Sequence, residues 1–411
     1  MSQNDTLSRE SRIVQVGVGR DERTGAISYP IYPSATYRHP AVGESTGYDY
    51  TRSGNPTRQA LEEGLAHLEG GSRALAFSSG MAALTTVFLH FSSGDHLIVS
   101  EDLYGGTYRV LDQVFGKLGL TASYVDTTST RAVEAAVTGQ TRAILVETPG
   151  NPLFGVADIS ALAALSRARG LLLIVDNTFL TPVLQRPLEL GADIVVHSAT
   201  KYLGGHNDLC SGVVVARNPE LGERLYFLQN STGATLPPQD SWLLMRSLKT
   251  LPLRMERHCS NALKIARWLR RQPRVEKVYF PGLEEHPGHA LSQRQARGFG
   301  GMLSFRVESP ELARQVLKRL CLVSFAESLG GVESLMTLPA VQTHGDIPEA
   351  ERQRLGICES LLRLSAGIED PDDIIADLEQ ALATSRPQRH GDTETPRRAP
   401  YAGALRSESC G

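Results

Sequence analysis

The run Asp193-Ile-Val-Val-His-Ser-Ala-Thr-Lys201 decides the fold that we predict for this chain. Its apolar, β-branched residues are typical of a buried strand, and the strand is followed by a serine, a threonine and a lysine. Burial lowers the pKa of an amine, and a neutral amine is a nucleophile that can form a Schiff base with an aldehyde. A surface lysine at a strand end is the ordinary alternative, so the rest of the chain must decide between the two.

The 411-residue chain has an ordinary globular composition, with 41% hydrophobic and 21% charged residues. Its length predicts two domains. The net charge of −3 argues against a nucleic-acid partner and against a basic membrane-binding patch. The apolar runs are too short to span a bilayer and the amino terminus has no secretory core, so we expect a cytoplasmic protein.

The cysteines and histidines give no sign of a metal or disulfide framework. The five cysteines have no short paired spacing, which favours a reducing compartment. His286 and His289, with Glu284 nearby, lie around a Pro-Gly turn. Catalytic zinc needs three protein ligands in fixed geometry, so we interpret this segment as a solvated loop and expect no metal.

Strands and helices alternate after residue 60, which predicts an α/β fold with a mostly parallel sheet and helices on both faces. The expected strands of this sheet include residues 73–79, 96–100, 142–147, 171–176 and 194–198. A mostly helical stretch at 242–271, interrupted by Pro252, is expected to lead into a second domain with strands at 302–307 and 361–365.

This pattern divides the chain into four parts. We expect an extended arm at residues 1–60, rich in Tyr, Pro, Gly and Ser, and a large domain at 61–250. A smaller C-terminal α/β domain follows at 251–385. Residues 386–411 are polar and contain proline, so we expect a disordered tail.

Polar residues follow four of the expected strands at their carboxyl ends, where open α/β sheets bind ligands. The first strand leads through Ser78-Ser79-Gly80-Met81 directly into a helix, whose amino-terminal N–H groups suit an anion. The other three segments are Glu147-Thr-Pro-Gly-Asn151, Asp176-Asn-Thr178 and Ser198-Ala-Thr-Lys201.

Asp176 follows the apolar run Leu-Leu-Leu-Ile-Val, where a buried carboxylate requires a cationic partner. A protonated pyridine nitrogen is such a partner. Together with an aldehyde-reactive Lys201 and phosphate-binding hydroxyls at Ser198 and Thr200, it predicts pyridoxal 5′-phosphate (PLP) as the cofactor. A helix-capping aspartate is the alternative. An acid that binds a ribose fits less well, because no G-x-G-x-x-G follows the first strand.

Two segments outside these strand ends also carry candidate residues. Tyr50 and Arg52 are two residues apart in the arm, so in an extended segment their side chains face the same way, and arginine suits a phosphate. A plain turn around Gly54 is the alternative. Tyr104 is expected either to stack on an aromatic ring or simply to pack.

Arg363 lies within the apolar strand Leu-Leu-Arg-Leu-Ser. A guanidinium in such a strand needs an anion. The candidates are a structural acid such as Glu359 and the carboxylate of a substrate.

Taken together, these motifs resemble the Cys/Met-metabolism family of PLP enzymes, the trans-sulfuration group. They cover roughly residues 27–383 in the family's order. The motifs are Tyr50-Thr-Arg-Ser-Gly-Asn-Pro-Thr, Ser78-Ser-Gly-Met, Tyr104-Gly-Gly-Thr, Glu147-Thr-Pro-Gly-Asn-Pro, Val175-Asp-Asn-Thr-Phe, Ser198-Ala-Thr-Lys-Tyr, Glu327-Ser-Leu-Gly-Gly-Val-Glu-Ser-Leu and Arg363-Leu-Ser-Ala-Gly-Ile-Glu.

The resemblance implies the PLP fold-type I, aminotransferase-like architecture and a homotetramer built from tight dimers. It also implies that Lys201 forms the Schiff base with PLP, that Asp176 faces the pyridine nitrogen and that Tyr104 stacks on the ring. The resemblance implies that Asn151 contacts the ring hydroxyl. The residues implied to hold the phosphate are Gly80, Met81, Ser198 and Thr200, and Tyr50 and Arg52 are implied to reach the phosphate of the neighbouring subunit. Those implied to bind the substrate α-carboxylate are Arg363 and Ser328.

Three positions bear on which member of the family the chain resembles. Gly106 stands where methionine γ-lyases carry a cysteine, whereas Glu327 is similar to a glutamate of cystathionine γ-synthases and γ-lyases, and Asp49 looks synthase-like. We therefore expect γ-replacement or γ-elimination on cystathionine-type substrates, with Glu327 near the distal amino group. Cystathionine β-lyase is the alternative. A non-catalytic scaffold is a remote one, because Lys201 and Asp176 are intact and unpaired buried charges are costly.

Overall fold

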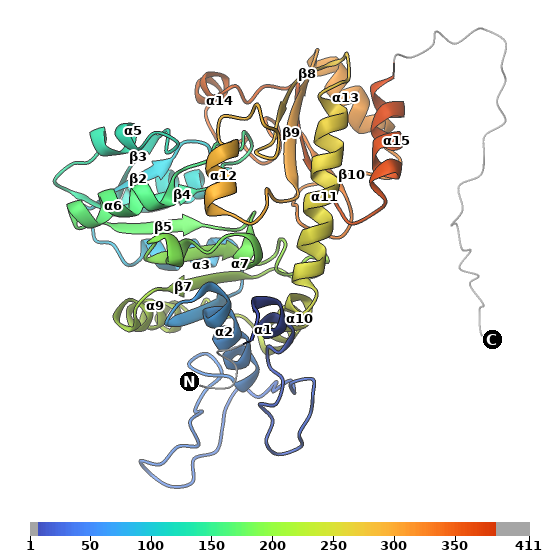
Figure 1. The fold of residues 1–411 in the computed structure, drawn as a ribbon. Coiled ribbons are helices and arrows are strands. Elements are labelled where there is room, and N and C mark those ends of the chain that lie inside the picture. Colours follow the sequence, from blue (N-terminus) through green and yellow to red (C-terminus); the bar gives the residue numbers. More distant parts are fainter. Residues whose placement is uncertain (1–6, 384–411) are drawn as a thin grey trace, which may run out of the picture.

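The computed structural model describes residues 7–383, which contain two β-sheets (Figure 1). The expected tail at residues 386–411 lies outside the described residues. The larger sheet has seven strands in the order β1-β7-β6-β5-β4-β2-β3. These strands are β1 (Arg73–Phe77), β2 (His96–Ser100), β3 (Thr121–Val125), β4 (Thr141–Glu147), β5 (Leu172–Asp176), β6 (Ile194–Ser198) and β7 (Gly212–Ala216).

The larger sheet is mostly parallel, which confirms the expected fold class. Among its described strands only β7 runs antiparallel to its neighbours, β1 and β6. The sequence interpretation missed β3 and β7. The chain passes from β6 to β7 through a loop with no helix, so the alternation of strands and helices gives no signal for β7.

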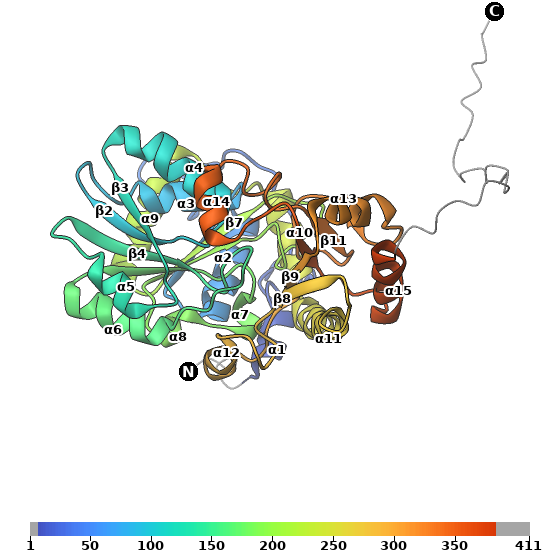
Figure 2. The ribbon, with the colours of Figure 1, turned by 90° about the horizontal axis from the view of Figure 1, so that it is seen from above.

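Both faces of the larger sheet are buried. Along β5, Leu173 and Val175 pack in one apolar cluster, whereas Ile174 packs in a second cluster on the other face. A run of buried aliphatic residues therefore fills both clusters, because strand residues alternate between faces. Helices near this sheet are α2 (Pro56–Glu69), α3 (Gly80–Phe88), α4 (Gly105–Val110), α5 (Thr130–Ala135), α6 (Ile159–Arg169), α7 (Thr181–Leu184), α8 (Pro187–Leu190) and α9 (Pro219–Thr232). Figure 2 shows α3 and α4 on one side of the sheet and α5, α6 and α8 on the other.

The smaller sheet has five strands in the order β10-β11-β12-β9-β8 and its own apolar core. Its strands are β8 (Val275–Tyr279), β9 (Met302–Val307), β10 (Ser324–Phe325), β11 (Leu335–Thr337) and β12 (Leu361–Ser365). The remaining helices of this part of the chain are α10 (Pro238–Leu248), α11 (Leu251–Leu269), α12 (His289–Gln295), α13 (Pro310–Arg319), α14 (Glu349–Leu355) and α15 (Pro371–Leu382). The predicted strands at 302–307 and 361–365 are confirmed.

Two helices occupy residues 242–271, where we expected one interrupted helix. Pro252 does not break a helix, because it lies in the first turn of α11. Backbone N–H groups in the first turn have no acceptor within the helix, so the N–H that proline lacks is not needed there. The start of α11 also supports the site. The Nη1 of Arg254 donates to the carbonyl of Tyr202 at 2.6 Å and Nη2 donates to the carbonyl of Ser247 at 3.0 Å. This contact ties the loop after Lys201 to the junction between α10 and α11.

The amino-terminal segment contains a helix that the sequence interpretation did not predict, α1 (Arg9–Val14). Figure 1 shows the loops between α1 and α2 projecting from the bottom of the molecule, away from both sheets. A single β-bridge between Thr36 and Tyr50 joins two parts of these loops. Within the described residues, no helix has the length and apolar character that a membrane span requires.

Candidate active site

A cavity of about 310 Å³ lies at the carboxyl ends of β4, β5 and β6. The structure brings together there all but two of the site residues expected from the sequence. These lining residues are Gly80, Met81, Tyr104, Asn151, Asp176, Ser198, Thr200, Lys201, Glu327, Ser328 and Arg363. The lining residues that the sequence interpretation did not assign to the site include Glu147, Thr178, Cys210 and Thr343.

Lys201 points into this cavity and not into bulk solvent. Its Nζ donates to the Oγ of Ser328 at 2.7 Å. Burial, together with the nearby positive charge of Arg363, lowers the pKa of Lys201 from 10.5 to about 8. A substantial part of the amine is therefore unprotonated in mildly alkaline solution, as a nucleophile requires.

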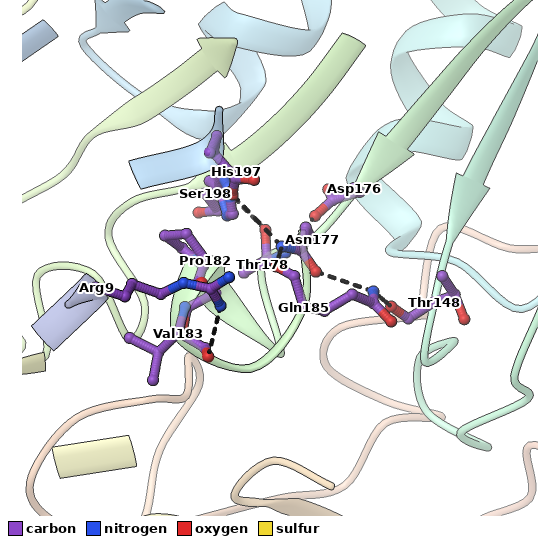
Figure 3. Close-up of polar contacts among 12 residues, drawn as sticks. Arg9, Thr148, Asp176, Asn177, Thr178, Pro182, Val183, Gln185, His197 and Ser198 are labelled. Atoms are coloured by element: carbon purple, nitrogen blue, oxygen red, sulfur yellow. Dashed lines mark hydrogen bonds and ion pairs between the residues drawn. The ribbon is translucent and has the colours of Figure 1, made fainter. Parts of the chain in front are cut away.

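Asp176 ends β5, and its Oδ1 accepts the backbone N–H of Thr178 at 2.9 Å. The following helix, α7, begins only at Thr181, so Asp176 is not a helix cap. The Oγ1 of Thr178 in turn accepts the backbone N–H of Ser198 at 2.8 Å (Figure 3). These two bonds fix the turn after β5 against the end of β6, with the Asp176 carboxylate lining the cavity.

Glu147 is the partner of Asp176 in the parallel register of β4 and β5. Its Oε2 accepts the backbone N–H of Tyr104 at 2.9 Å. Burial, and then the negative charge of Asp176, raises the pKa of Glu147 well above its ordinary value, and burial also raises the pKa of Asp176. Glu147 opens one of the quoted sequence motifs, but only the register shows that its carboxylate lies beside Asp176.

The amino terminus of α3 forms a tight concave wall. The Oγ of Ser79 accepts the N–H of Ala82 at 3.0 Å, so the helix is capped by a side chain. The N–H groups of Gly80 and Met81, the first two residues of α3, have no acceptor within the helix and are available to an anion. A Cβ at Gly80 would lie 2.8 Å from the Cβ of Ser198, so only glycine allows this approach.

Arg363 is buried, with 2% of its surface exposed, in the strand β12. Its Nη1 donates to the Oδ1 of Asn151 at 2.8 Å and its Nη2 donates to the carbonyl of Ser328 at 3.3 Å. Its Nε is buried without a hydrogen-bond partner in residues 7–383. The structural acid that we considered, Glu359, is not its partner, because Glu359 pairs with Arg314. The guanidinium is therefore available to an external carboxylate.

Tyr104 does not pack in the core, since 41% of its surface is exposed and its ring borders the cavity. A Cβ at Gly106 would lie 2.4 Å from the Tyr104 ring. A side chain at that position would therefore displace the ring. Gly106 thus permits the observed placement of Tyr104.

Tyr50 and Arg52 do not line the cavity. Their side chains do lie together, because the Arg52 guanidinium carbon is 5.7 Å from the centre of the Tyr50 ring. Arg52 also donates to the Oδ1 of Asn230 at 3.0 Å. Asn55 caps α2 directly after this segment.

A buried polar network lies beneath the turn after β5 (Figure 3). The Nε2 of His197 is 2.6 Å from the Oε1 of Glu69, and both side chains are 1% exposed. Asn177 and Gln185 exchange hydrogen bonds of 2.9 and 3.0 Å. Such a network holds the residue directly after Asp176 and the neighbouring strand β6, and the sequence carried no signal for it, because Glu69 comes from a distant segment.

The match to a protein-family model decides the identity of this fold and site. The model for the Cys/Met metabolism PLP-dependent enzymes matches residues 10–383. The chain belongs to this family.

Relatives of this PLP-dependent enzyme carry several different names. A cystathionine gamma-synthase/O-acetylhomoserine (thiol)-lyase of Bacillus subtilis is 54% identical over 91% of this chain and 96% of its own length. A cystathionine beta-lyase of Lactococcus lactis is 48% identical over 91% of this chain and 99% of its own. The crystal structure of cystathionine gamma-lyase from Lactobacillus plantarum, complexed with L-serine, superimposes with a TM-score of 0.89 at 48% identity, covering 91% of this chain and 98% of that one.

The cavity of this family member has the groups that PLP requires. Lys201 offers an amine that can react with an aldehyde, and Asp176 offers an acid for a ring cation. The α3 terminus, together with the hydroxyl of Ser198, forms the narrow wall that an anionic phosphate would contact. The residues present therefore fit the cofactor that the family uses.

Proposed function

We propose that this enzyme acts at Cγ of homoserine-derived amino acids, by γ-replacement or γ-elimination of the cystathionine type. The observation that carries the proposal is the position of Glu327. It lines the cavity and directly precedes Ser328, which contacts both Lys201 and Arg363. A carboxylate at this place would accept a hydrogen bond from the distal amino group of cystathionine.

The cofactor would be held by residues from several elements of the larger sheet. Lys201 would bind it covalently, Asp176 would face the ring nitrogen, and Tyr104 would stack on the ring. The ring hydroxyl would contact Asn151. The residues that would hold the phosphate are Gly80, Met81, Ser198 and Thr200.

The substrate would be oriented by Arg363 and Ser328. Arg363 would bind the α-carboxylate of the substrate. Within the described residues its Nε has no hydrogen-bond partner, and its Nη1 bonds an amide oxygen and not a carboxylate. PLP, when bound, supplies an electron sink for negative charge that develops on the substrate. The Nζ of Lys201 would accept the proton of the substrate Cα, which its lowered pKa allows.

The site of one subunit would be completed by its neighbour. Tyr50 and Arg52 lie together in the segment between α1 and α2 and outside the cavity, which supports a role in the adjoining subunit. We propose the homotetramer of tight dimers that the family resemblance implies, in the cytoplasm. The arm that we assign to residues 1–60 would supply this contact.

Cystathionine β-lyase is the second candidate, because a relative with that name is nearly as similar to this chain as the γ-synthase. The experiment that separates the candidates supplies L-cystathionine to the purified holoenzyme and identifies the 2-oxo acid. Release of 2-oxobutyrate supports γ-cleavage, whereas pyruvate shows β-cleavage.

A parallel reaction with an O-acylhomoserine and cysteine tests synthesis. Formation of cystathionine there supports γ-replacement. If neither reaction proceeds while the protein carries its cofactor, the proposed specificity is wrong.

A further inference from the structure

His344 lies in the segment between β11 and α14 and is fully buried, with 0% of its surface exposed. Its Nε2 is 2.9 Å from the backbone carbonyl oxygen of Asn151, and its Nδ1 is 2.8 Å from the Oγ1 of Thr343. Thr343 lines the active-site cavity, whereas His344 is not among the lining residues. The histidine therefore contacts the site only through other residues.

The direction of the His344 hydrogen bond follows from its chemistry. Burial, together with the nearby charge of Arg363, lowers the pKa of His344 to about 4, so the ring is neutral at neutral pH. A carbonyl oxygen cannot donate, so the proton must be on Nε2 and is donated to Asn151. In this tautomer Nδ1 is an acceptor for the Thr343 hydroxyl.

Asn151 is held from three directions. Its backbone N–H donates to the carbonyl of Asp102 at 3.2 Å, which ties it to the loop after β2. Its backbone carbonyl accepts from His344, and its side-chain Oδ1 accepts from Arg363 at 2.8 Å. Asn151 thus contacts both the segment that carries His344 and the strand β12, which carries Arg363. The orientation of the Asn151 amide fixes the position of Nη1 in the Arg363 guanidinium.

We propose that His344 is a positioning residue for the substrate carboxylate, acting through Asn151 on Arg363. The inference rests on the proposed function, in which Arg363 binds the α-carboxylate. By donating to the backbone of Asn151, His344 holds the amide oxygen toward Nη1 of Arg363, so the remaining guanidinium donors are aimed before the substrate arrives.

Other contacts hold the same segment in place without His344. The carbonyl of Thr343 packs so closely on α4 that a Cβ at Gly105 would lie 2.5 Å away. Arg109 of α4 pairs with Asp346 at 2.7 Å. Substitution of His344 is therefore expected to remove its hydrogen bond to the backbone of Asn151 without releasing the segment.

The test compares H344N with H344Q in the holoenzyme. Glutamine can present an amide donor near the position of Nε2, whereas asparagine is one methylene shorter and loses the bond. We expect H344N to raise KM about tenfold with little change in kcat, as for a lost buried hydrogen bond, and H344Q to stay within about twofold of the wild type. H289A is the control, because it removes a ring that also bonds a backbone carbonyl, that of Pro281 at 2.7 Å, and Pro281, unlike Asn151, does not line the cavity.

A pair of ligands separates carboxylate positioning from general damage. L-Alanine and ethylamine differ by the carboxyl group, and their binding can be followed as a change in the visible absorption of the cofactor. H344N should weaken L-alanine binding about tenfold and leave ethylamine binding unchanged. Equal weakening of both ligands, or an unchanged KM in H344N, overturns the inference.

Failure of the proposed reaction and failure of this inference are distinguishable. If the wild type cleaves cystathionine at Cβ, the α-carboxylate is still present and the same comparison applies. If the wild type turns over neither substrate, the proposed function fails, but the L-alanine and ethylamine titrations still test His344. Should H344N lose its cofactor, H344Q decides the matter, because a raised KM or weakened L-alanine binding in H344Q contradicts the proposed role.

Discussion

Glu147 and Asp176 are paired across the parallel strands β4 and β5, so two carboxylates line the same end of the cavity. Both are half-buried, because one side of each faces the cavity and the rest is enclosed by protein. Two neighbouring carboxylates in such surroundings do not both ionise readily, and the negative charge of Asp176 is the second cause, after burial, that raises the pKa of Glu147. We infer that Glu147 holds the proton, which leaves Asp176 as the anion for a ring cation.

The first prediction compares E147Q with D176N. Glutamine is neutral and keeps an oxygen that accepts the Tyr104 N–H, so E147Q should retain turnover to within about tenfold of the wild type. D176N removes the anion opposite the ring cation and should lower kcat by about a hundredfold or more. Steady-state rates and the visible spectrum of the cofactor measure both. Equal losses in the two variants would contradict this prediction, because they would show that turnover needs the charge of Glu147 as well as that of Asp176.

The second prediction concerns pH. The pKa of Lys201 is lowered from 10.5 to about 8, so its amine is protonated below pH 8 and neutral above it. Only the neutral amine attacks an aldehyde, so the rate at which cofactor-free protein incorporates PLP should rise about tenfold per pH unit below 8 and then level off. The growth of visible absorbance measures this rate. A rate that still rises through pH 10 would show an ordinary lysine pKa.

K201A is the control for the same experiment. It has no amine at this position, so the visible band should not form at any pH. The same result tests the remote alternative of a non-catalytic scaffold, because a wild type without the band would favour that alternative.

The third prediction concerns the wall formed by α3. In G80A the new methyl group would meet both the Cβ and the Oγ of Ser198, at 2.8 and 2.9 Å, so the helix terminus must shift. We expect a loss of roughly 1–3 kcal/mol of stability, typical of overpacking, together with weaker cofactor binding. Thermal unfolding and a PLP titration measure the two effects. G139A is the matched control, because a Cβ there meets nothing within 4 Å.

The fourth prediction tests whether subunits share a site. R52A and K201A should each be inactive or nearly so. If Arg52 serves the neighbouring subunit, each mixed dimer contains one site with both residues intact, and random mixing should restore activity at about a quarter of the sites. The assay is turnover after co-expression or refolding of the two variants together. Activity that stays at the level of the single variants would place Arg52 in the site of its own subunit.

The strand ends were predictable from the sequence because each carries a local signal. The buried run before Lys201 and the one before Asp176 are both strings of aliphatic residues that end in polar groups, and parallel strands bring such ends to one edge. The pairing of Arg363 was not predictable, because Glu359 is close in sequence but points to Arg314. His344 was missed for the same reason, since its partner Asn151 is 193 residues away.

The sequence by itself determined the fold class and the placement of a lysine and an aspartate at the ends of buried strands, because these depend on the order of residues along the chain. Only the tertiary structure decided which polar side chains lie together: Glu147 beside Asp176, Arg363 against Asn151, and Tyr50 and Arg52 outside the cavity. The physical reason is that charge energies depend on separation in space and on burial. Strand register and the packing of the two sheets with their helices set both the separation and the burial of these groups. No local segment of the sequence specifies that register or that packing.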